Sequence, residues 1–187
     1  MRYAGYASAA ICPRACKVSA PRPVRILGVD PGSRATGYAI LDAVADVADV
    51  VDHGVLRLPS KAPLTERLRT LHDRIVQLVR HHDPDEVVLE EAFAAANVRS
   101  ALVLGQVRGV VVVAVGSVRP VFEYSARTVK KAVAGYGQAD KQQVAQMVTR
   151  LLRLPEVPPQ DAADALALAI CHMHSRTLAV RLGGVER

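Results

Sequence analysis

Four acidic residues have the side-chain type and the sequence surroundings for metal-dependent chemistry. Asp30 ends the apolar run VRILGVD, Glu90 ends the run EVVLE, and Asp161 and Asp164 lie in QDAADALALAI. If the two runs are parallel strands, their carboxyl ends meet at one edge of a sheet, where open α/β sheets bind ligands. Acids that meet there repel one another unless a cation neutralises them, and hard divalent metals prefer oxygen ligands. The four acids therefore predict a divalent metal site.

A metal site built from carboxylates suits the hydrolysis of a phosphodiester bond. Two cations about 3.5–4 Å apart activate a water at neutral pH and stabilise the leaving 3′ oxygen during an in-line displacement. Four carboxylates around two Mg²⁺ leave coordination positions for phosphate oxygens, and Mn²⁺ accepts the same ligands. No side chain then needs to act as the general base. Lys141 is expected to offset charge on the transition state.

Each of these acids also has a simpler interpretation. Asp30 precedes Pro31 and Gly32, and an Asp-Pro-Gly turn favours aspartate on its own. Asp161 and Asp164 lie three residues apart at the expected start of a helix, where the helix dipole stabilises acids. Taken singly, the residues leave both interpretations open. Their joint presence favours the metal site.

Hydrophobic periodicity predicts the elements that would position these acids. The stretch from Val24 has no polar face, which is typical of a strand buried on both sides, and Pro31 ends it. Apolar residues at helical spacing after Pro63 predict a crossover helix, so the strand that follows it should run parallel to a neighbour. Gly37 indicates a close approach of another segment. The alanines of the last helix are small enough to let that helix lie against the sheet.

The expected order is three strands that form an antiparallel meander, then helix, strand, helix, strand and a helical remainder. This order is typical of an α/β fold. The strands are expected over Val24–Asp30, Thr36–Leu41, Val47–Leu58, Glu86–Glu90 and Pro120–Tyr124, and the main helices over Leu64–Val79, Asn97–Val115, Ala139–Leu154 and Gln160–Ser175, with a turn at Gly135–Gly137.

The length and composition bound the class of protein. The 187 residues, half of them hydrophobic, suit one α/β domain with a full core. No continuous apolar run approaches the ~18 residues of a membrane span, so no membrane association is expected. Three cysteines without a paired spacing or histidine partners are best explained as free thiols in a reducing cytoplasm.

Charge and hydrophobic periodicity together indicate how the chain is organised. Residues 1–25 hold five basic residues and no acid, which leaves 19 basic against 18 acidic residues in the rest. Residues 1–23 lack hydrophobic periodicity and are expected to be a disordered or mis-annotated extension, residues 24–175 a nuclease domain, and residues 176–187 a flexible tail. Within the domain, residues 99–153 carry nine basic side chains against two acids, which is typical either of a phosphate-binding surface or of a solvated basic face.

Four separated stretches together resemble the bacterial RuvC family of Holliday junction resolvases. They are VRILGVDPG, VVLEEAF, VFEYSARTVKKAVAGYGQADK and QDAADALALAI, and the resemblance runs from Val24 to about His174. It implies a ribonuclease H-like mixed five-stranded sheet flanked by helices, a homodimer, a partnership with RuvA and RuvB, and four-way junction DNA as substrate. It also implies symmetric nicks with 5′-phosphate and 3′-hydroxyl ends. The N-terminal extension departs from the family, whose members begin at the first strand.

The resemblance also assigns roles to individual residues. The acidic tetrad of the family matches Asp30, Glu90, Asp161 and Asp164, and Phe93 matches an aromatic residue that enters the junction and stacks on a base. Lys130 and Lys141 fall where the family has lysines near the scissile phosphate. Lys131 and Arg127 belong to the same basic stretch and are expected to contact DNA.

Three other functions are compatible with parts of the sequence. The spacing from Asp30 to Gly37 also occurs in the phosphate loop of actin-like and sugar-kinase ATPases, which need two such domains. The YqgF family of RuvC-like nucleases, which act on ribosomal RNA precursors, is a nearer alternative, but it lacks the LEEAF and AGYGQADK stretches. A non-catalytic nucleic-acid binding module would be favoured by loss of one of the four acids, and all four are present.

Overall fold

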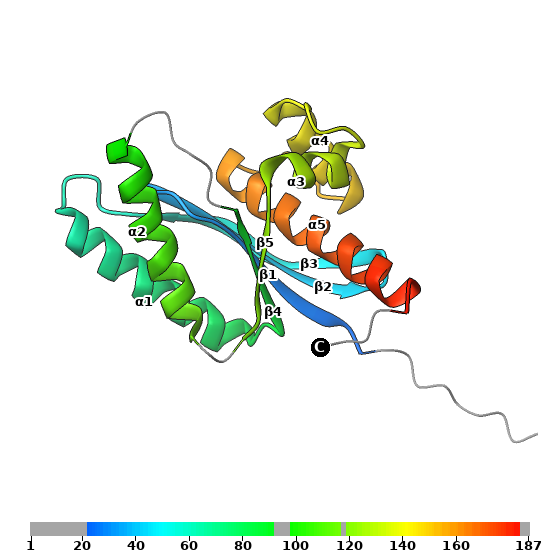
Figure 1. The fold of residues 1–187 in the computed structure, drawn as a ribbon, viewed down its shortest axis with the longest axis horizontal. Coiled ribbons are helices and arrows are strands. Elements are labelled where there is room, and N and C mark those ends of the chain that lie inside the picture. Colours follow the sequence, from blue (N-terminus) through cyan, green and yellow to red (C-terminus); the bar gives the residue numbers. More distant parts are fainter. Residues whose placement is uncertain (1–21, 92–97, 117–118, 184–187) are drawn as a thin grey trace, which may run out of the picture.

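The computed structural model describes residues 22–91, 98–116 and 119–183, which form a five-stranded sheet with helices on both faces (Figure 1). In chain order the elements are β1 (Val24–Asp30), β2 (Ala35–Val44), β3 (Val47–Arg57), α1 (Leu64–His82), β4 (Glu86–Glu90), α2 (Val98–Val115), β5 (Val121–Tyr124), α3 (Ala126–Ala134), α4 (Lys141–Leu151) and α5 (Gln160–Arg181).

The sheet has the mixed topology that the sequence predicts. Its strand order is β3-β2-β1-β4-β5; the first three strands are antiparallel, and β4 is parallel to both β1 and β5. Val29 pairs with Leu89 across the β1 and β4 register, so the next residues, Asp30 and Glu90, end neighbouring strands at the same edge. The crossover helix α1 makes this arrangement possible, because parallel neighbours cannot be joined by a tight turn.

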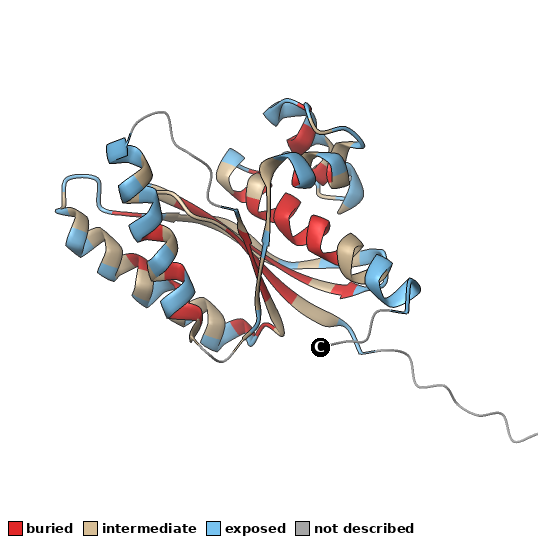
Figure 2. Cartoon of the chain, in the orientation of Figure 1, coloured by how far each residue is buried: buried red, intermediate tan, exposed pale blue. Residues whose placement is uncertain are grey.

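Each face of the sheet packs against its own hydrophobic core. Leu27 and Val29 face α1 and α2, whereas Ile26 faces α3, α4 and α5. Alternation along β1 therefore buries both faces of that strand, which explains why its sequence shows no polar face. Figure 2 shows the middle of α5 buried where it crosses the sheet.

Two glycines let the backbone of α5 approach the sheet. A Cβ atom on Gly37 would lie 1.8 Å from the carbonyl oxygen of Asp161, and one on Gly28 would lie 2.3 Å from that of Ala165. Ala165 and Ala169 are fully buried on the facing side of the helix. The structure thus confirms both expectations, the close approach at Gly37 and the small face of the last helix.

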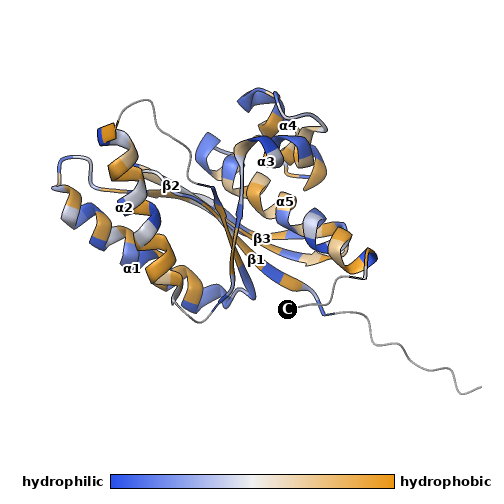
Figure 3. Cartoon of the chain, in the orientation of Figure 1, coloured by the Kyte–Doolittle hydropathy of each residue, from blue (hydrophilic) through white to orange (hydrophobic). Residues whose placement is uncertain are grey.

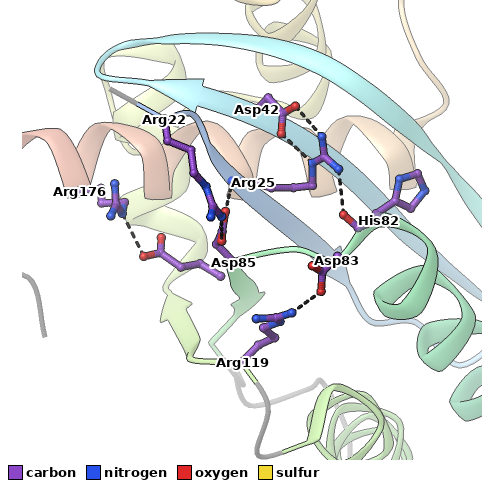
Figure 4. A network of polar contacts seen from close by, with 9 residues as sticks. Arg22, Arg25, Asp42, His82, Asp83, Asp85, Arg119 and Arg176 are labelled. Carbon is purple, nitrogen blue, oxygen red and sulfur yellow. Dashed lines mark hydrogen bonds and ion pairs between the residues drawn. The ribbon is translucent and has the colours of Figure 1, made fainter. Parts of the chain in front are cut away.

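Ion pairs fasten the opposite end of the sheet, around Arg25 (Figure 4). Two guanidinium nitrogens of Arg25 donate to the Asp42 carboxylate at 2.7 Å, and a third donates to the carbonyl of His82 at 2.9 Å. The backbone N–H of Arg25 donates to Asp85 at 2.8 Å. These contacts tie the starts of β1 and β4 to the end of α1, far from the edge where Asp30 and Glu90 lie.

Several predicted boundaries are wrong. The last helix continues to Arg181, so the first residues of the predicted flexible tail are helical; Arg176 donates to Glu86 at 3.0 Å and holds this part of the helix to β4. Helix α4 begins at Lys141, later than predicted, because Asp140 and Gln143 form a capping box there. Residues 1–21 of the predicted extension, and the predicted helix cap Asn97, lie outside the described residues.

Helix α2 qualifies one expectation about membranes. By length and composition its 18 residues could span a bilayer, with a mean hydropathy of 1.7, and only 17% of that window is buried. The continuous apolar runs of the sequence do not indicate this, because Arg108 and the glycines of the helix interrupt them. Figure 3 shows the hydrophobic residues along α2.

The contact between Gly37 and α5 predicts a destabilising substitution. Gly37→Ala should lower the free energy of unfolding by about 1–3 kcal/mol, because the added methyl group would meet the backbone of α5, which cannot rotate away. Gly54→Ala is the matched control in β3: its methyl group would meet the Tyr38 ring at 3.0 Å, and that side chain can move. Urea unfolding of both variants measures the difference. Equal decreases in the free energy of unfolding would contradict the prediction, because they would show that the α5 backbone moves as easily as the Tyr38 side chain.

Candidate active site

The site begins at the adjacent ends of β1 and β4. Asp30 is the last residue of β1 and Glu90 the last of β4, and both are half-buried. Thr36 closes the turn that follows Asp30, because its hydroxyl donates to the carbonyl of Gly32 at 3.2 Å. Arg67, on α1, donates to the carbonyl of Ser33 at 2.7 Å and holds the same turn from the other side. Asp30 therefore sits on a fixed strand end.

A cleft opens beside these strand ends, between the sheet and α3, α4 and α5. Its acidic lining consists of Asp30, Glu90 and Asp164, and its basic lining of Lys130 and Lys141. Apolar residues of α3, α4 and α5 complete the wall: Ala126, Val129, Val144, Ala167 and Leu168. The fold thus brings three predicted acids and two predicted lysines from five elements to one cleft.

Burial and neighbouring negative charges raise the pKa of the two acids at the strand ends. Burial raises the pKa of Asp30 to about 7, with further contributions from the negative charges of Asp164, Glu90 and Asp161, while Lys141 acts in the opposite direction. The pKa of Glu90 is also raised, first by burial and then by Asp164. Two carboxyl groups with raised pKa values in one cleft form a site that gains from a bound cation.

Lys141 supplies positive charge to this cleft from the N-terminus of α4. Its Nζ lies 3.2 Å from Oδ2 of Asp164, and the other carboxylate oxygen of Asp164 accepts a hydrogen bond from Gln160 at 3.0 Å. The attraction of Asp164, and of Asp30 and Glu90 beyond it, raises the pKa of Lys141 in spite of its partial burial. The lysine side chain remains 68% exposed, so it can reach a ligand that enters the cleft.

Asp161 lies at the margin of the site. It is half-buried in the first turn of α5, where its backbone carbonyl faces Gly37, and it does not line the cleft. Its charge still reaches Asp30 and contributes to the raised pKa there. The structure therefore brings three acids of the predicted tetrad together directly and couples the fourth to them electrostatically.

The donor set fits a divalent cation in its chemistry. The groups in the cleft that could bind a cation are the carboxylate oxygens of Asp30, Glu90 and Asp164, and hard cations prefer oxygen ligands. In residues 22–91, 98–116 and 119–183, no three acidic, histidine or cysteine side chains already converge on one point. A cation would therefore compete with the Lys141 amino group for Asp164 and draw the acids together.

The predicted DNA contacts differ in where they lie. Lys130 lines the cleft, whereas Lys131 and Arg127 are exposed on α3 outside it. The Arg127 side chain packs beside Gly137, where a Cβ atom would lie 2.7 Å from its Cγ. Phe93 lies outside the described residues.

The contacts of Arg108 were not predicted from the sequence, in which this residue is one of nine basic residues between 99 and 153. Arg108 lies on α2 and donates to the backbone carbonyl of Glu90, and it also pairs with the carboxylate of Glu123 on β5. One signal could have indicated an inward-facing side chain: Arg108 precedes Val111 by three residues, and Val111 faces the core.

The sheet order and the acids at the ends of β1 and β4, faced by Asp164 of α5, define a ribonuclease H-like domain with an acidic cleft. The family model described as crossover junction endodeoxyribonuclease RuvC matches residues 26–172, and the chain therefore belongs to the RuvC family.

Individual relatives support this assignment over nearly the whole chain. The crossover junction endodeoxyribonuclease RuvC of Magnetococcus marinus is 43% identical over 176 residues, which cover 91% of this chain and 98% of that protein. The protein of the same name from Legionella pneumophila is 47% identical over 152 residues, 81% of this chain and 87% of that protein. A solved structure of T. thermophilus RuvC in complex with a Holliday junction substrate superposes with a TM-score of 0.78 at 32% identity, covering 86% of this chain and 97% of that one.

The raised pKa of Asp30 predicts a pH-dependent stability. The folded value is about 7 and the unfolded value about 4, so this contribution to stability is complete below pH 4 and is lost as the pH rises through 7. With divalent metals chelated, the free energy of unfolding of the wild type should therefore fall more between pH 4 and pH 8 than that of Asp30→Asn. Urea titrations at each pH measure it. Parallel profiles for the two proteins would contradict the prediction.

Proposed function

We propose that this chain is a structure-selective endonuclease that resolves four-way Holliday junctions in DNA recombination and repair. The observation that carries the proposal is the cleft in which Asp30, Glu90 and Asp164 face Lys130 and Lys141, in a chain of the RuvC family. Carboxylates able to hold divalent cations, beside lysines able to meet phosphate, suit hydrolysis of a DNA backbone. The relatives' names and the junction-bound relative support DNA junctions as the substrate class.

Asp30, Glu90 and Asp164 would hold the metal, with Asp161 completing the ligand set from the first turn of α5. We infer two Mg²⁺ per subunit, replaceable by Mn²⁺, because both are hard ions that accept carboxylate ligands. When bound, the ions supply an activated water and a stabilised leaving oxygen, so that the products carry 5′-phosphate and 3′-hydroxyl ends. Lys141, released from Asp164, would stabilise negative charge on the reacting phosphate.

The basic side chains around the cleft would bind the DNA backbone. Lys130, which lines the cleft, would contact phosphate there, and the exposed Lys131 and Arg127 would extend that contact along α3. Phe93, three residues beyond Glu90 in the sequence, is proposed to stack on an unpaired base at the crossover. Association with RuvA and RuvB, and a cytoplasmic location, are further proposals that rest on the family.

Cleavage of a mobile four-way junction tests the proposal directly. In Mg²⁺ the wild type should cut the junction and spare a duplex of matched sequence. Asp30→Asn, Glu90→Gln, Asp161→Asn and Asp164→Asn should each reduce cleavage by more than about 100-fold, because each removes a proposed metal ligand, while junction binding without metal stays intact. Asp73→Asn is the matched control, since this acid is exposed on α1. Equal cutting of junction and duplex would refute the substrate class, and near wild-type turnover in any of the four variants would remove that residue from the site.

We propose that two copies of the chain associate through α2. One side of this helix presents Val98, Leu102, Gly105, Gly109 and Val112, which are spaced four, three, four and three residues apart. Leu102 is 65% exposed, and a Cβ atom added to either glycine would have no neighbour within 4 Å. Such a stripe matches the spacing of a helix-to-helix seam, and the glycines allow a second helix to approach closely. A symmetric homodimer would give the two active sites needed for paired nicks.

Leu102→Glu should convert this dimer to a monomer, because it places a charge in the middle of the apolar seam. Leu178→Glu is the matched control: Leu178 is 56% exposed on α5, away from the stripe. Sedimentation equilibrium should give a mass twice that of the chain for the wild type and the control, and the mass of one chain for Leu102→Glu. A wild-type monomer, or a Leu102→Glu dimer, would place the subunit contact elsewhere.

A further inference from the structure

Arg108 occupies an unusual place for a basic residue in a chain that binds DNA. Its side chain is only 16% exposed, and it points from α2 toward the ends of β4 and β5. Nη1 donates to the backbone carbonyl of Glu90, and Nη2 pairs with a carboxylate oxygen of Glu123. Both terminal nitrogens are therefore engaged by groups of the protein, which leaves Arg108 poorly suited to bind phosphate.

The contact with Glu90 completes a clamp on one peptide unit. The N–H of Glu91 donates to the carbonyl of Tyr124 on β5 at 2.8 Å, and the carbonyl of Glu90 accepts from Arg108. The peptide bond that follows Glu90 is thus held by one hydrogen bond from each side. Because this is the last peptide of β4, the strand ladder alone does not fix its orientation.

We propose that Arg108 is a positioning residue for the acidic cleft. It holds the peptide that carries Glu90, and so it keeps the Glu90 carboxylate aimed at Asp30 and Asp164 against their repulsion. Glu123 fixes the second arm of the guanidinium and thereby sets its direction. Arginine holds its donors in a rigid planar fork, whereas the three donors of lysine rotate about a single nitrogen and do not set a fixed direction.

The packing of α2 does not depend on this contact. Val107 and Val111 are fully buried between α2 and the sheet, so the helix keeps its apolar anchor when Arg108 is replaced. A residue that served only to attach α2 would be redundant with these valines. The two hydrogen bonds on this peptide therefore affect the position of Glu90 in the cleft more than the stability of the fold. Their effect on cleavage rests on the proposed nuclease function.

Arg108→Met tests the proposal, with Arg108→Lys as the conservative variant. Arg119→Met is the matched control, because Arg119, just before β5, also pairs with an acid, Asp83 at the end of α1, and neither residue lines the cleft. The first readout is the Mg²⁺ concentration that gives half of the metal-induced rise in melting temperature. It should increase about 10- to 100-fold in Arg108→Met, less in Arg108→Lys and not at all in Arg119→Met. The second readout is junction cleavage: kcat should fall by a similar factor while the Kd for junction DNA without metal stays unchanged.

Three results would overturn the proposal. A weaker Kd with a salt slope reduced by about one, at unchanged kcat, would make Arg108 a phosphate contact. A lower melting temperature with the wild-type response to Mg²⁺ would make it a purely structural residue, and wild-type values throughout would leave it without a role. If Arg108→Met fails to fold, Glu123→Gln must reproduce a smaller loss of Mg²⁺ response, and its absence counts against the clamp. Should the wild type cleave no junction, the proposed function fails, but the Mg²⁺ response still decides the role of Arg108.

Discussion

The close approach of the α5 backbone to the sheet is the constraint on which the site depends. Gly28 and Gly37 present no side chain toward the helix, so the carbonyls of Asp161 and Ala165 occupy the space that a Cβ atom would take. The distance between helix and sheet is therefore set by backbone contact. A larger residue at either glycine would lift the first turns of α5, and with them the two aspartates, away from the ends of β1 and β4.

That approach creates an electrostatic cost that the rest of the site offsets. Asp30, Glu90 and Asp164 share one cleft, and burial together with mutual repulsion raises the pKa of both strand-end acids. Lys141 compensates part of the negative charge through its contact with Asp164. This lysine side chain is largely exposed, so the contact with Asp164 does not bury it. The site is thus partly neutralised by its own chain, and under the proposed function a metal ion would take the place of that lysine.

The surrounding structure holds the strand ends in place against this repulsion. At the far end of the sheet, the ion pairs of Arg25 fix the starts of β1 and β4. At the near end, Arg67 holds the turn after Asp30, and Arg108 holds the peptide after Glu90. The face of α2 opposite the sheet is apolar and exposed, so one helix both braces the cleft and offers the surface proposed for a second subunit.

Much of this arrangement could be predicted from the sequence, because its causes are local. Pro31 ends β1 directly after Asp30, the periodicity of α1 predicts a crossover that leaves the next strand parallel to a neighbour, and Gly37 and the alanines of α5 indicate a close contact. These features predict the antiparallel meander, a fourth strand parallel to a neighbour and, if that neighbour is β1, acids that meet at one edge, but they do not predict the full strand order.

Tertiary structure decided what depends on contacts between distant residues. Helix α5 continues to Arg181 because Arg176 meets Glu86, which lies 90 residues earlier in the chain. Asp161 lies at the margin of the cleft because its backbone rests on Gly37. The three-residue spacing of Asp161 and Asp164 predicts the same helix face for both and does not reveal this difference. Lys130 faces the cleft while Lys131 faces solvent, and Arg108 holds a backbone carbonyl although it belongs to a stretch that looks like a DNA-binding surface. Composition and spacing specify which side chains are charged, but the direction in which each one points is determined only when the helices pack on the sheet.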